Sequence, residues 1–373
     1  MTDASWRRWW AAVACLAVAA LAGACAPAAP DLVLVDGRVF TADPERPWAE
    51  ALAVRGDRIV AVGSSAEVSA LVGPATVRRQ LGGRVVVPGF NDAHVTDPNG
   101  PPAAIRVLAA EAMAAGVTSM QWFVGERTVR DAGRALVEAD VPLRVRVLRM
   151  PRPGPDGETI DSRPHLPPQP TIRIDIRGMG FRLRAADEAR IRQAVGWAYG
   201  TEDLLAIEPL DAGAMRAYVA AVTATGIPEV WRRKRPRIEQ APMAVVGQLQ
   251  AVASLGLVAV QRPDGTVPLA SLVQAGVPLA LATDTATRPF AALAAATSTA
   301  AGSERLTMAQ AITALTRGSA YAQLADRDKG HLTIGALADL AVLSVDPFAE
   351  DADLSSARSV LTLIGGRVVH DVP

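Results

Sequence analysis

The stretch from Val87 to His94 is where the chain most clearly indicates chemistry. A short apolar strand ends in Pro88-Gly89, and His94 follows a few residues later. If this strand belongs to a barrel of parallel strands, His94 lies at the carboxyl end of the strands, where catalytic groups collect. A lone histidine can also be structural, so the context of His94 decides between a ligand and a packed ring.

Two carboxylates, Asp92 and Glu239, could serve as a paired acid and base. For Asp92, capping of a strand end is the simpler interpretation. Glu239 follows a short β-prone run, and its pattern fits either a pocket or the packed interior.

Several other kinds of chemistry have no sequence signal. The chain contains neither a phosphate-binding glycine loop nor a Gly-x-Ser-x-Gly nucleophile elbow. The only cysteines are Cys15 and Cys25, both near the N-terminus, so the rest of the chain has no thiolate for catalysis or for a disulfide.

The elements that would position these residues fall into two groups. Residues 117–124, 143–148, 257–260 and 277–282 read as strands that follow helical stretches, which predicts a parallel sheet, either open or closed into a barrel. Both ends of the chain are rich in β-hairpin signals, such as Asp36-Gly37 and Gly365-Gly366. Because a hairpin cannot bury a face alone, the two ends are expected to pair in one small β-domain.

Two segments interrupt this pattern. Residues 151–170 contain seven prolines and His165, which predicts a loop. Residues 231–237 form a basic run, which we interpret as a solvated surface loop.

The first thirty residues are typical of a bacterial export signal. Arg7 and Arg8 precede an apolar run that is short for a membrane span, and Cys25 follows small residues as in a lipoprotein processing site. The sequence therefore predicts an exported protein of the periplasm or cell envelope, with Cys25 as the lipidated residue. A plain cleaved signal, an uncleaved anchor and a twin-arginine signal are the alternatives, and membrane contact is expected only through this leader.

Composition excludes one class of partner. The 373-residue chain has 38 basic and 38 acidic residues, and only 4% of its residues are aromatic. It therefore has neither a global positive field nor a base-stacking surface, and we expect no nucleic acid partner.

Several segments together resemble the amidohydrolase superfamily, and most closely its family 3 branch. They are residues 31–63, 81–94, 116–119, 237–239, 277–284, 304–307, 329–330, 335–340 and 365–369. The resemblance implies a TIM (β/α)8-type barrel over residues 85–330, and a composite β-sandwich over residues 31–84 and 331–373, after a leader at 1–30. The segments that usually cover the substrate are short here, so the chain reads as a truncated member with an open pocket.

The resemblance also implies a metal site, which this sequence matches only in part. His94 corresponds to the first histidine of the family, and Asp284 to the aspartate that is both a ligand and the catalytic proton shuttle. The other expected ligand positions hold poor ligands or cations, namely Thr96, Arg182 and Gln240. The fifth-strand histidine has no counterpart, which predicts a weak or missing strand near residues 226–236. The sequence therefore predicts a degenerate metal site. The resemblance implies that the site holds zinc or another divalent metal, and the missing ligands leave open that it holds no metal.

Three functions remain open from the sequence. By resemblance, the protein is a hydrolase of non-peptide carbon–nitrogen bonds that uses a metal-activated water, with His94, Asp284, Glu239 and His165 as the residues that could rebuild a site. The alternatives are a catalytically inactive, exported pseudoenzyme that binds a small molecule, and a folded relic without a role.

Overall fold

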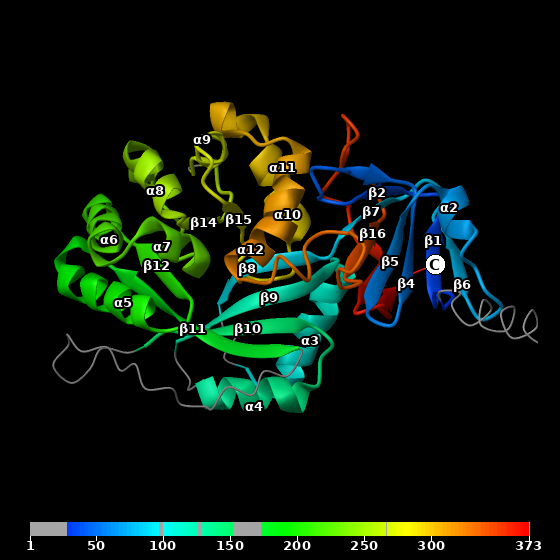
Figure 1. The fold of residues 1–373 in the computed structure, drawn as a ribbon, viewed down its shortest axis with the longest axis horizontal. Coiled ribbons are helices and arrows are strands. Elements are labelled where there is room, and N and C mark those ends of the chain that lie inside the picture. The colour runs from blue at the N-terminus through cyan, green and yellow to red at the C-terminus, as the bar shows by residue number, and fades with distance from the viewer. Residues whose placement is uncertain (1–27, 97–99, 126–128, 152–172, 266, 373) are drawn as a thin grey trace, which may run out of the picture.

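A computed structural model describes residues 28–96, 100–125, 129–151, 173–265 and 267–372. The leader with Cys25 and most of the proline-rich segment with His165 lie outside these residues. Figure 1 shows two β-sheets at one end of the molecule and a larger body of strands and helices at the other.

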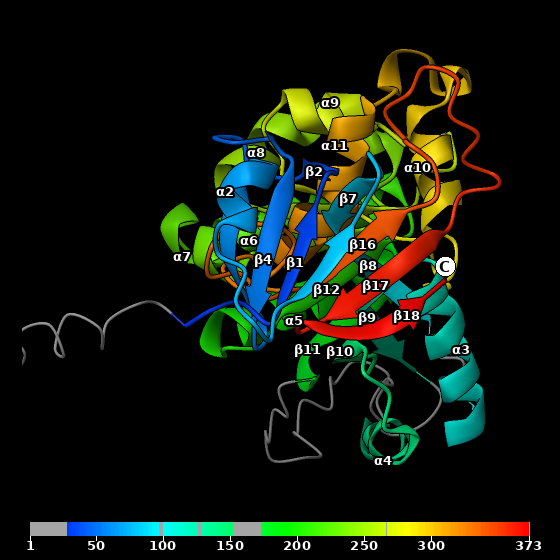
Figure 2. The same cartoon turned by 90° about the vertical axis from the view of Figure 1, so that its right-hand side faces the viewer.

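The small end is a sandwich of two sheets built from both ends of the chain. The first sheet has the order β5 (Arg58–Gly63), β4 (Ala51–Arg55), β1 (Leu32–Val35) and β6 (Val77–Gln80). The second has the order β18 (Arg367–Asp371), β17 (Ser359–Ile364), β16 (Leu340–Leu343), β7 (Val85–Pro88), β2 (Arg38–Phe40) and β3 (Trp48–Ala49). Figure 2 looks onto these strands, with the early and late segments side by side.

The alternation within β1 shows why the two sheets stack. Leu32 and Leu34 pack with residues of the second sheet such as Val86 and Leu340. Val33 and Val35 face the other way, toward the short helix α2 (Ser65–Ser69). An uninterrupted apolar run is what a strand buried on both faces requires.

The larger body is a barrel of eight parallel strands, which confirms the fold that the family resemblance implied. In order around the barrel they are β8 (Phe90–Thr96), β9 (Val117–Val124), β10 (Arg144–Arg149), β11 (Ile174–Leu183), β12 (Leu205–Pro209), β13 (Arg237–Glu239), β14 (Val258–Gln261) and β15 (Leu279–Leu281). The barrel is nearly closed, because the first and last strands meet through one parallel bridge between Val95 and Asp284.

Two expectations about the barrel strands were wrong. The apolar run before Pro88-Gly89 is β7, which pairs with β2 and β16 of the sandwich, so His94 lies within the next strand, β8. No strand is weak or missing near residues 226–236: the fifth strand is β12, and the segment itself forms α7 (Pro228–Lys234). This helix starts at a proline and buries Trp231, whose indole donates to the Val222 carbonyl at 2.9 Å.

Helices surround the barrel strands. The α-helices are α3 (Pro102–Ala114), α4 (Val129–Ala139), α5 (Glu188–Gly200), α6 (Ala212–Thr225), α7, α8 (Leu249–Leu255), α9 (Leu269–Gln274), α10 (Pro289–Thr297), α11 (Met308–Thr313) and α12 (Ser319–Ala322). The 3₁₀ helices are η2 (Ala185–Asp187), η3 (Met243–Gln248) and η4 (Thr299–Glu304), and η5 (Ala314–Gly318) is a π-helix. In the described part of the chain, no helix has both the length and the apolar character to cross a membrane.

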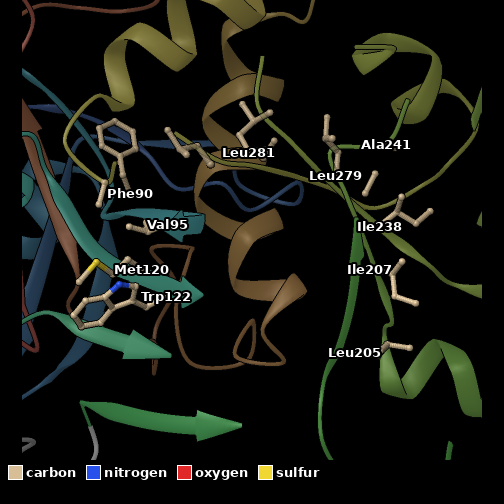
Figure 3. Close-up of a cluster of buried hydrophobic side chains, with 14 of the residues drawn as sticks. Phe90, Val95, Met120, Trp122, Leu205, Ile207, Ile238, Ala241, Leu279 and Leu281 are labelled. Atoms are coloured by element: carbon tan, nitrogen blue, oxygen red, sulfur yellow. The ribbon is translucent and has the colours of Figure 1, made fainter. Parts of the chain in front are cut away.

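The barrel strands divide their side chains between two environments. Apolar side chains such as Met120, Ile207 and Ile238 belong to the main hydrophobic core, part of which Figure 3 shows between strands and helices. The alternate positions hold small residues such as Ala93 and Ala280, together with buried polar residues. The barrel interior is therefore partly polar, and its polar groups lead to the candidate site.

Candidate functional site

His94 is held at the carboxyl end of the barrel by contacts from two other strands. Its Nδ1 lies 2.8 Å from Oε2 of Glu239 on β13. Its ring stacks on Phe123 of β9, with the centroids 3.9 Å apart and an interplanar angle of 12°. The His94 side chain keeps 14% exposure, whereas that of Glu239 keeps only 2%. The ring is thus fixed in orientation, and Nε2 is the nitrogen left for a water or a ligand.

Arg237, which is fully buried, holds the Glu239 carboxylate in place through an ion pair. Arg237 and Glu239 are two residues apart on β13, so their side chains share one face of the strand. The Arg237 Nε donates to Oε1 of Glu239 at 2.6 Å, and Nη2 donates to the Ala93 carbonyl at 2.7 Å. The Nη1 group donates to the Gln121 side chain. Every edge of this guanidinium therefore has a partner inside the barrel.

The charge on Glu239 follows from these contacts. Burial alone would raise its pKa, but the Arg237 charge and the hydrogen bond with His94 outweigh burial and hold the pKa below its usual value. Glu239 is therefore a buried carboxylate aimed at Nδ1 of His94. Such a carboxylate fixes the tautomer of the imidazole, with the proton on Nδ1 and the lone pair on Nε2.

Arg237 was not predicted as a site residue, because residues 231–237 read as a solvated basic loop. In the structure Arg237 has no exposed surface, and Trp231 is equally buried. The missed signal is the alternation Arg237-Ile238-Glu239, which places two opposite charges on one face of a strand whose other face is apolar.

Asp92 ties the first barrel strand to the last, as the capping interpretation predicted. Its carboxylate accepts hydrogen bonds from the backbone N–H groups of His94 at 3.1 Å, Thr283 at 3.1 Å and Ala286 at 3.2 Å. Burial raises the pKa of Asp92, although these hydrogen bonds oppose that effect. Asp92 thus holds the β8–β15 junction rather than pairing with Glu239.

The backbone of Asp284 lies next to that of His94, but the Asp284 side chain contacts Arg262 and not His94. Its backbone N–H donates to the His94 carbonyl at 3.2 Å, and its carboxylate forms an ion pair with Arg262. The backbone N–H of Arg262 in turn donates to Oε1 of Gln240 at 3.0 Å. Asp284, Arg262 and Gln240 therefore form a second polar group at the same end of the barrel.

The remaining predicted positions do not converge on His94. Arg182 on β11 pairs with Glu208 on β12, with Nε 2.8 Å from Oε2. Thr96, the last residue of β8, is exposed. The structure thus brings together His94 and Glu239, and separately Asp284 and Gln240, while Arg182 belongs to an ion pair of its own.

The described residues do not fit the zinc site that the resemblance implied. A structural or catalytic zinc needs at least three protein ligands. No group of three or more His, Cys, Asp or Glu side chains that could hold a metal lies among the residues described. Nδ1 of His94 faces Glu239, and the Asp284 carboxylate faces a guanidinium.

Two buried carboxamides at this end of the barrel have polar atoms without partners. They are Nε2 of Gln240 and both side-chain polar atoms of Gln261, which make no hydrogen bond within the described part of the chain. Buried polar atoms are normally satisfied, so these amides are suited to a bound water or ligand.

Comparisons with known proteins agree with this architecture. A family model described as "Amidohydrolase family" matches residues 102–370, a range that starts after β8 and therefore excludes His94. Among curated proteins, the chain is 42% identical over 65 residues to Protein LONG AFTER FAR-RED 3 of Arabidopsis thaliana, covering 17% of this chain and 11% of that protein. It is 32% identical over 137 residues to imidazolonepropionase of Cupriavidus taiwanensis, covering 36% of this chain and 33% of that protein. These matches thus span a third or less of the relatives.

Solved structures show the same fold over most of the chain. A triazine hydrolase variant superposes with a TM-score of 0.68 at 18% identity, covering 91% of this chain and 94% of that one. An adenosine deaminase from Xanthomonas campestris with bound zinc superposes with a TM-score of 0.69 at 18% identity, covering 93% and 94%. At such identities the likeness concerns the fold alone.

Proposed function

The chain belongs to the amidohydrolase family, and we propose that it hydrolyses a carbon–nitrogen bond other than a peptide bond in a small molecule at the carboxyl end of the barrel. The observation that carries the proposal is the set of contacts among His94, Glu239 and Arg237, which orients one imidazole at that end. Hydrolases such as imidazolonepropionase and triazine hydrolase among the similar proteins support this class of reaction.

In this proposal His94 is the general base that activates water. Neutral Nε2 takes a proton from water while the water oxygen forms a bond to the electrophilic carbon. The resulting imidazolium is stabilised by the Glu239 carboxylate 2.8 Å from Nδ1. When the carbon–nitrogen bond breaks, Nε2 returns its proton to the leaving nitrogen. Because the described residues supply no three-donor group, no step is assigned to a metal.

Two half-exposed guanidiniums at the same end are suited to holding the substrate. The side chains of Arg182 and Arg262 are 59% and 49% exposed, and each is oriented by a carboxylate. A guanidinium has five N–H donors, so an arginine that already pairs with a carboxylate can still bind a carbonyl or carboxylate oxygen. Asp284 then orients Arg262, rather than acting as the proton shuttle that the resemblance implied.

The test is a hydrolysis screen with matched variants. The purified protein is incubated with N-formyl amines, cyclic imides, ureas and amino-substituted nitrogen heterocycles, and release of ammonia or amine is measured with and without added zinc. His94→Gln and Glu239→Gln should lower kcat by about 10²–10⁴-fold. Arg192→Gln, on the exposed face of α5, is the control and should leave kcat unchanged. The proposal is wrong if His94→Gln keeps the turnover of the wild type, or if the wild type hydrolyses none of the compounds with or without zinc.

The second candidate is a pseudoenzyme that binds a small molecule without turning it over. The unpartnered amides of Gln240 and Gln261 favour it, since a ligand at this end of the barrel could complete their hydrogen bonds. A compound that raises the melting temperature of the wild type but not of Gln261→Leu, with no product released, would support binding alone.

We also propose that the protein is exported and anchored through Cys25. The support is the sequence of the leader, with Arg7 and Arg8 before an apolar run. Metabolic labelling with a radioactive fatty acid should mark the wild type and not Cys25→Ala, and osmotic shock should release only the variant from the cells. An unlabelled wild-type protein in the cytoplasmic fraction would contradict this proposal.

A further inference from the structure

A second polar cavity opens at the opposite end of the barrel from His94. It has a volume of about 350 Å³ and lies where β10 and β11 begin, next to the turn between β4 and β5 of the sandwich. Its lining includes Arg58, Arg144, Arg146, Arg173 and Lys329. Because the strands are parallel, this amino-terminal end of the barrel is separate from the candidate active site.

The carboxylates of Asp57, Asp175 and Asp328 also line the cavity, and Asp339 lies just outside its lining. Each of the four forms an ion pair with an arginine. Arg144 holds Asp339 with Nε 2.6 Å from Oδ2, and Arg146 holds Asp175 with Nη2 2.6 Å from Oδ2. For Arg58, Nη1 lies 2.8 Å from Oδ1 of Asp328, and Nε lies 3.9 Å from Oδ1 of Asp57. None of these carboxylates forms a direct ion pair with the buried ammonium in the cavity, although Asp339 and Asp175 lie near enough to favour its charge.

Lys329 is that ammonium. It is only 6% exposed, and the hydrogen bond of Nζ goes to the neutral hydroxyl of Ser119. Within the described residues it forms no ion pair with a carboxylate. A buried cation without a direct ion pair, held among several arginines, is a place where an anion binds favourably.

Arg146 supplies a second donor without an acceptor. Its side chain is 10% exposed, and its Nε is buried with no hydrogen-bond partner in the part of the chain that the structure describes. A guanidinium and an ammonium that line one cavity, each with donors to spare, match the oxygen atoms of a carboxylate or a phosphate group.

We propose that this cavity is a binding site for the oxyanion group of a small molecule, with Lys329 and Arg146 as its buried donors and Arg173 at its rim. The inference is independent of the reaction at the other end of the barrel. The pKa of Lys329 gives further support: burial lowers it to about 7, an effect that Asp339 and Asp175 oppose and that Arg144 and Arg146 reinforce, and a bound anion would raise it again.

The test measures binding of two probes to the full chain. Equilibrium dialysis with radiolabelled orthophosphate, and separately with radiolabelled succinate, is run near pH 6.5 at constant ionic strength. We expect saturable binding at one site per chain for one or both probes. Binding of phosphate alone identifies a phosphorylated ligand, and binding of succinate alone identifies a carboxylate. Arg146→Gln and Lys329→Gln should each weaken binding about tenfold or more.

Controls separate the site from general charge effects and from misfolding. Arg192→Gln removes one positive charge from an exposed helix and should bind as the wild type does. Each variant must first show the circular dichroism spectrum of the wild type, and Arg146→Gln serves alone if Lys329→Gln fails to fold. If neither probe binds saturably to the wild type, or if folded Arg146→Gln binds both probes with wild-type affinity, the proposed site is wrong.

Discussion

Replacement of Arg237 by leucine is the sharpest test of the buried contacts that hold His94. In the wild type, this guanidinium donates to Glu239, to the Ala93 carbonyl and to Gln121, and it has no exposed surface. Arg237→Leu would leave the Glu239 carboxylate buried with only His94 beside it. Removing one partner of a buried ion pair costs about 3–5 kcal/mol of unfolding free energy. We expect a loss of this size at about pH 7.5.

The loss should shrink as the pH falls, and the sign follows from Glu239. In the wild type the pKa of Glu239 is lowered, so its ionisation adds stability above the unfolded pKa, and this stability is lost as pH falls through the folded pKa. In Arg237→Leu, burial would no longer be offset by the guanidinium, and the Glu239 pKa would rise. Protonation then removes the unpaired charge, so the deficit relative to wild type should be smaller at about pH 5 than at about pH 7.5.

The assay is urea unfolding of the wild type and variants at both pH values, followed by circular dichroism. Arg192→Leu, which breaks an exposed pair with Glu188 on α5, is the matched control and should stay within about 0.5 kcal/mol of wild type. The double variant Arg237→Leu/Glu239→Leu should be more stable than Arg237→Leu, because no unpaired charge remains. A deficit below about 1 kcal/mol that does not change with pH would refute the reasoning.

Three further predictions test other parts of the molecule. After dialysis against zinc, the purified protein should retain well under one equivalent of zinc per chain, because Asp284 pairs with Arg262 and the described residues form no group of three metal-binding side chains. One bound equivalent that is lost in both His94→Ala and Asp284→Ala would instead show a rebuilt metal site. The pKa of Lys329 in the folded protein is about 7, below its value in the unfolded chain, so the unfolded chain binds more protons between about pH 7 and pH 10. As the pH rises through that window, the free energy of unfolding of the wild type should therefore increase relative to that of Lys329→Met. Equal pH slopes of the two proteins in urea unfolding would contradict this. Gly318→Ala should cost about 1–3 kcal/mol, because a Cβ there would lie 2.0 Å from the Leu279 carbonyl oxygen, and an unchanged melting temperature would show that η5 can shift.

Polar side chains inside the barrel connect the His94 site at one end of the barrel with the second cavity at the other end. Ser119 and Gln121 lie on the same face of β9: Ser119 accepts from Lys329 at one end, and Gln121 accepts from Arg237, which leads to His94 at the other. Small residues such as Ala93 and Ala280 are also buried there, and the Ala93 carbonyl accepts a hydrogen bond from the Arg237 guanidinium. Accordingly, the same interior that orients His94 also places Lys329 beside the second cavity.

The sequence by itself determined the fold class and the order of its parts. Apolar runs alternating with helical stretches predicted a parallel sheet, the family resemblance implied that this sheet closes into a barrel, and turn signals at both ends predicted a β-domain shared by the termini. Those signals are local, since period and turn chemistry are set by neighbours along the chain. His94 and Asp92 could be picked out for the same reason, because they follow a strand end and a Pro-Gly pair.

Tertiary structure alone decided which side chains meet. Local pattern did not reveal that residues 228–234 form a helix, that the fifth strand lies at Leu205–Pro209, or that Arg237 is buried. The pairing of His94 with Glu239 joins the first and sixth strands, which are 145 residues apart in sequence, and it exists only once the barrel has closed. The same closure turns Asp284 to Arg262 and leaves Lys329 without a carboxylate partner among the described residues, because the partner of a charge is chosen by distance in space.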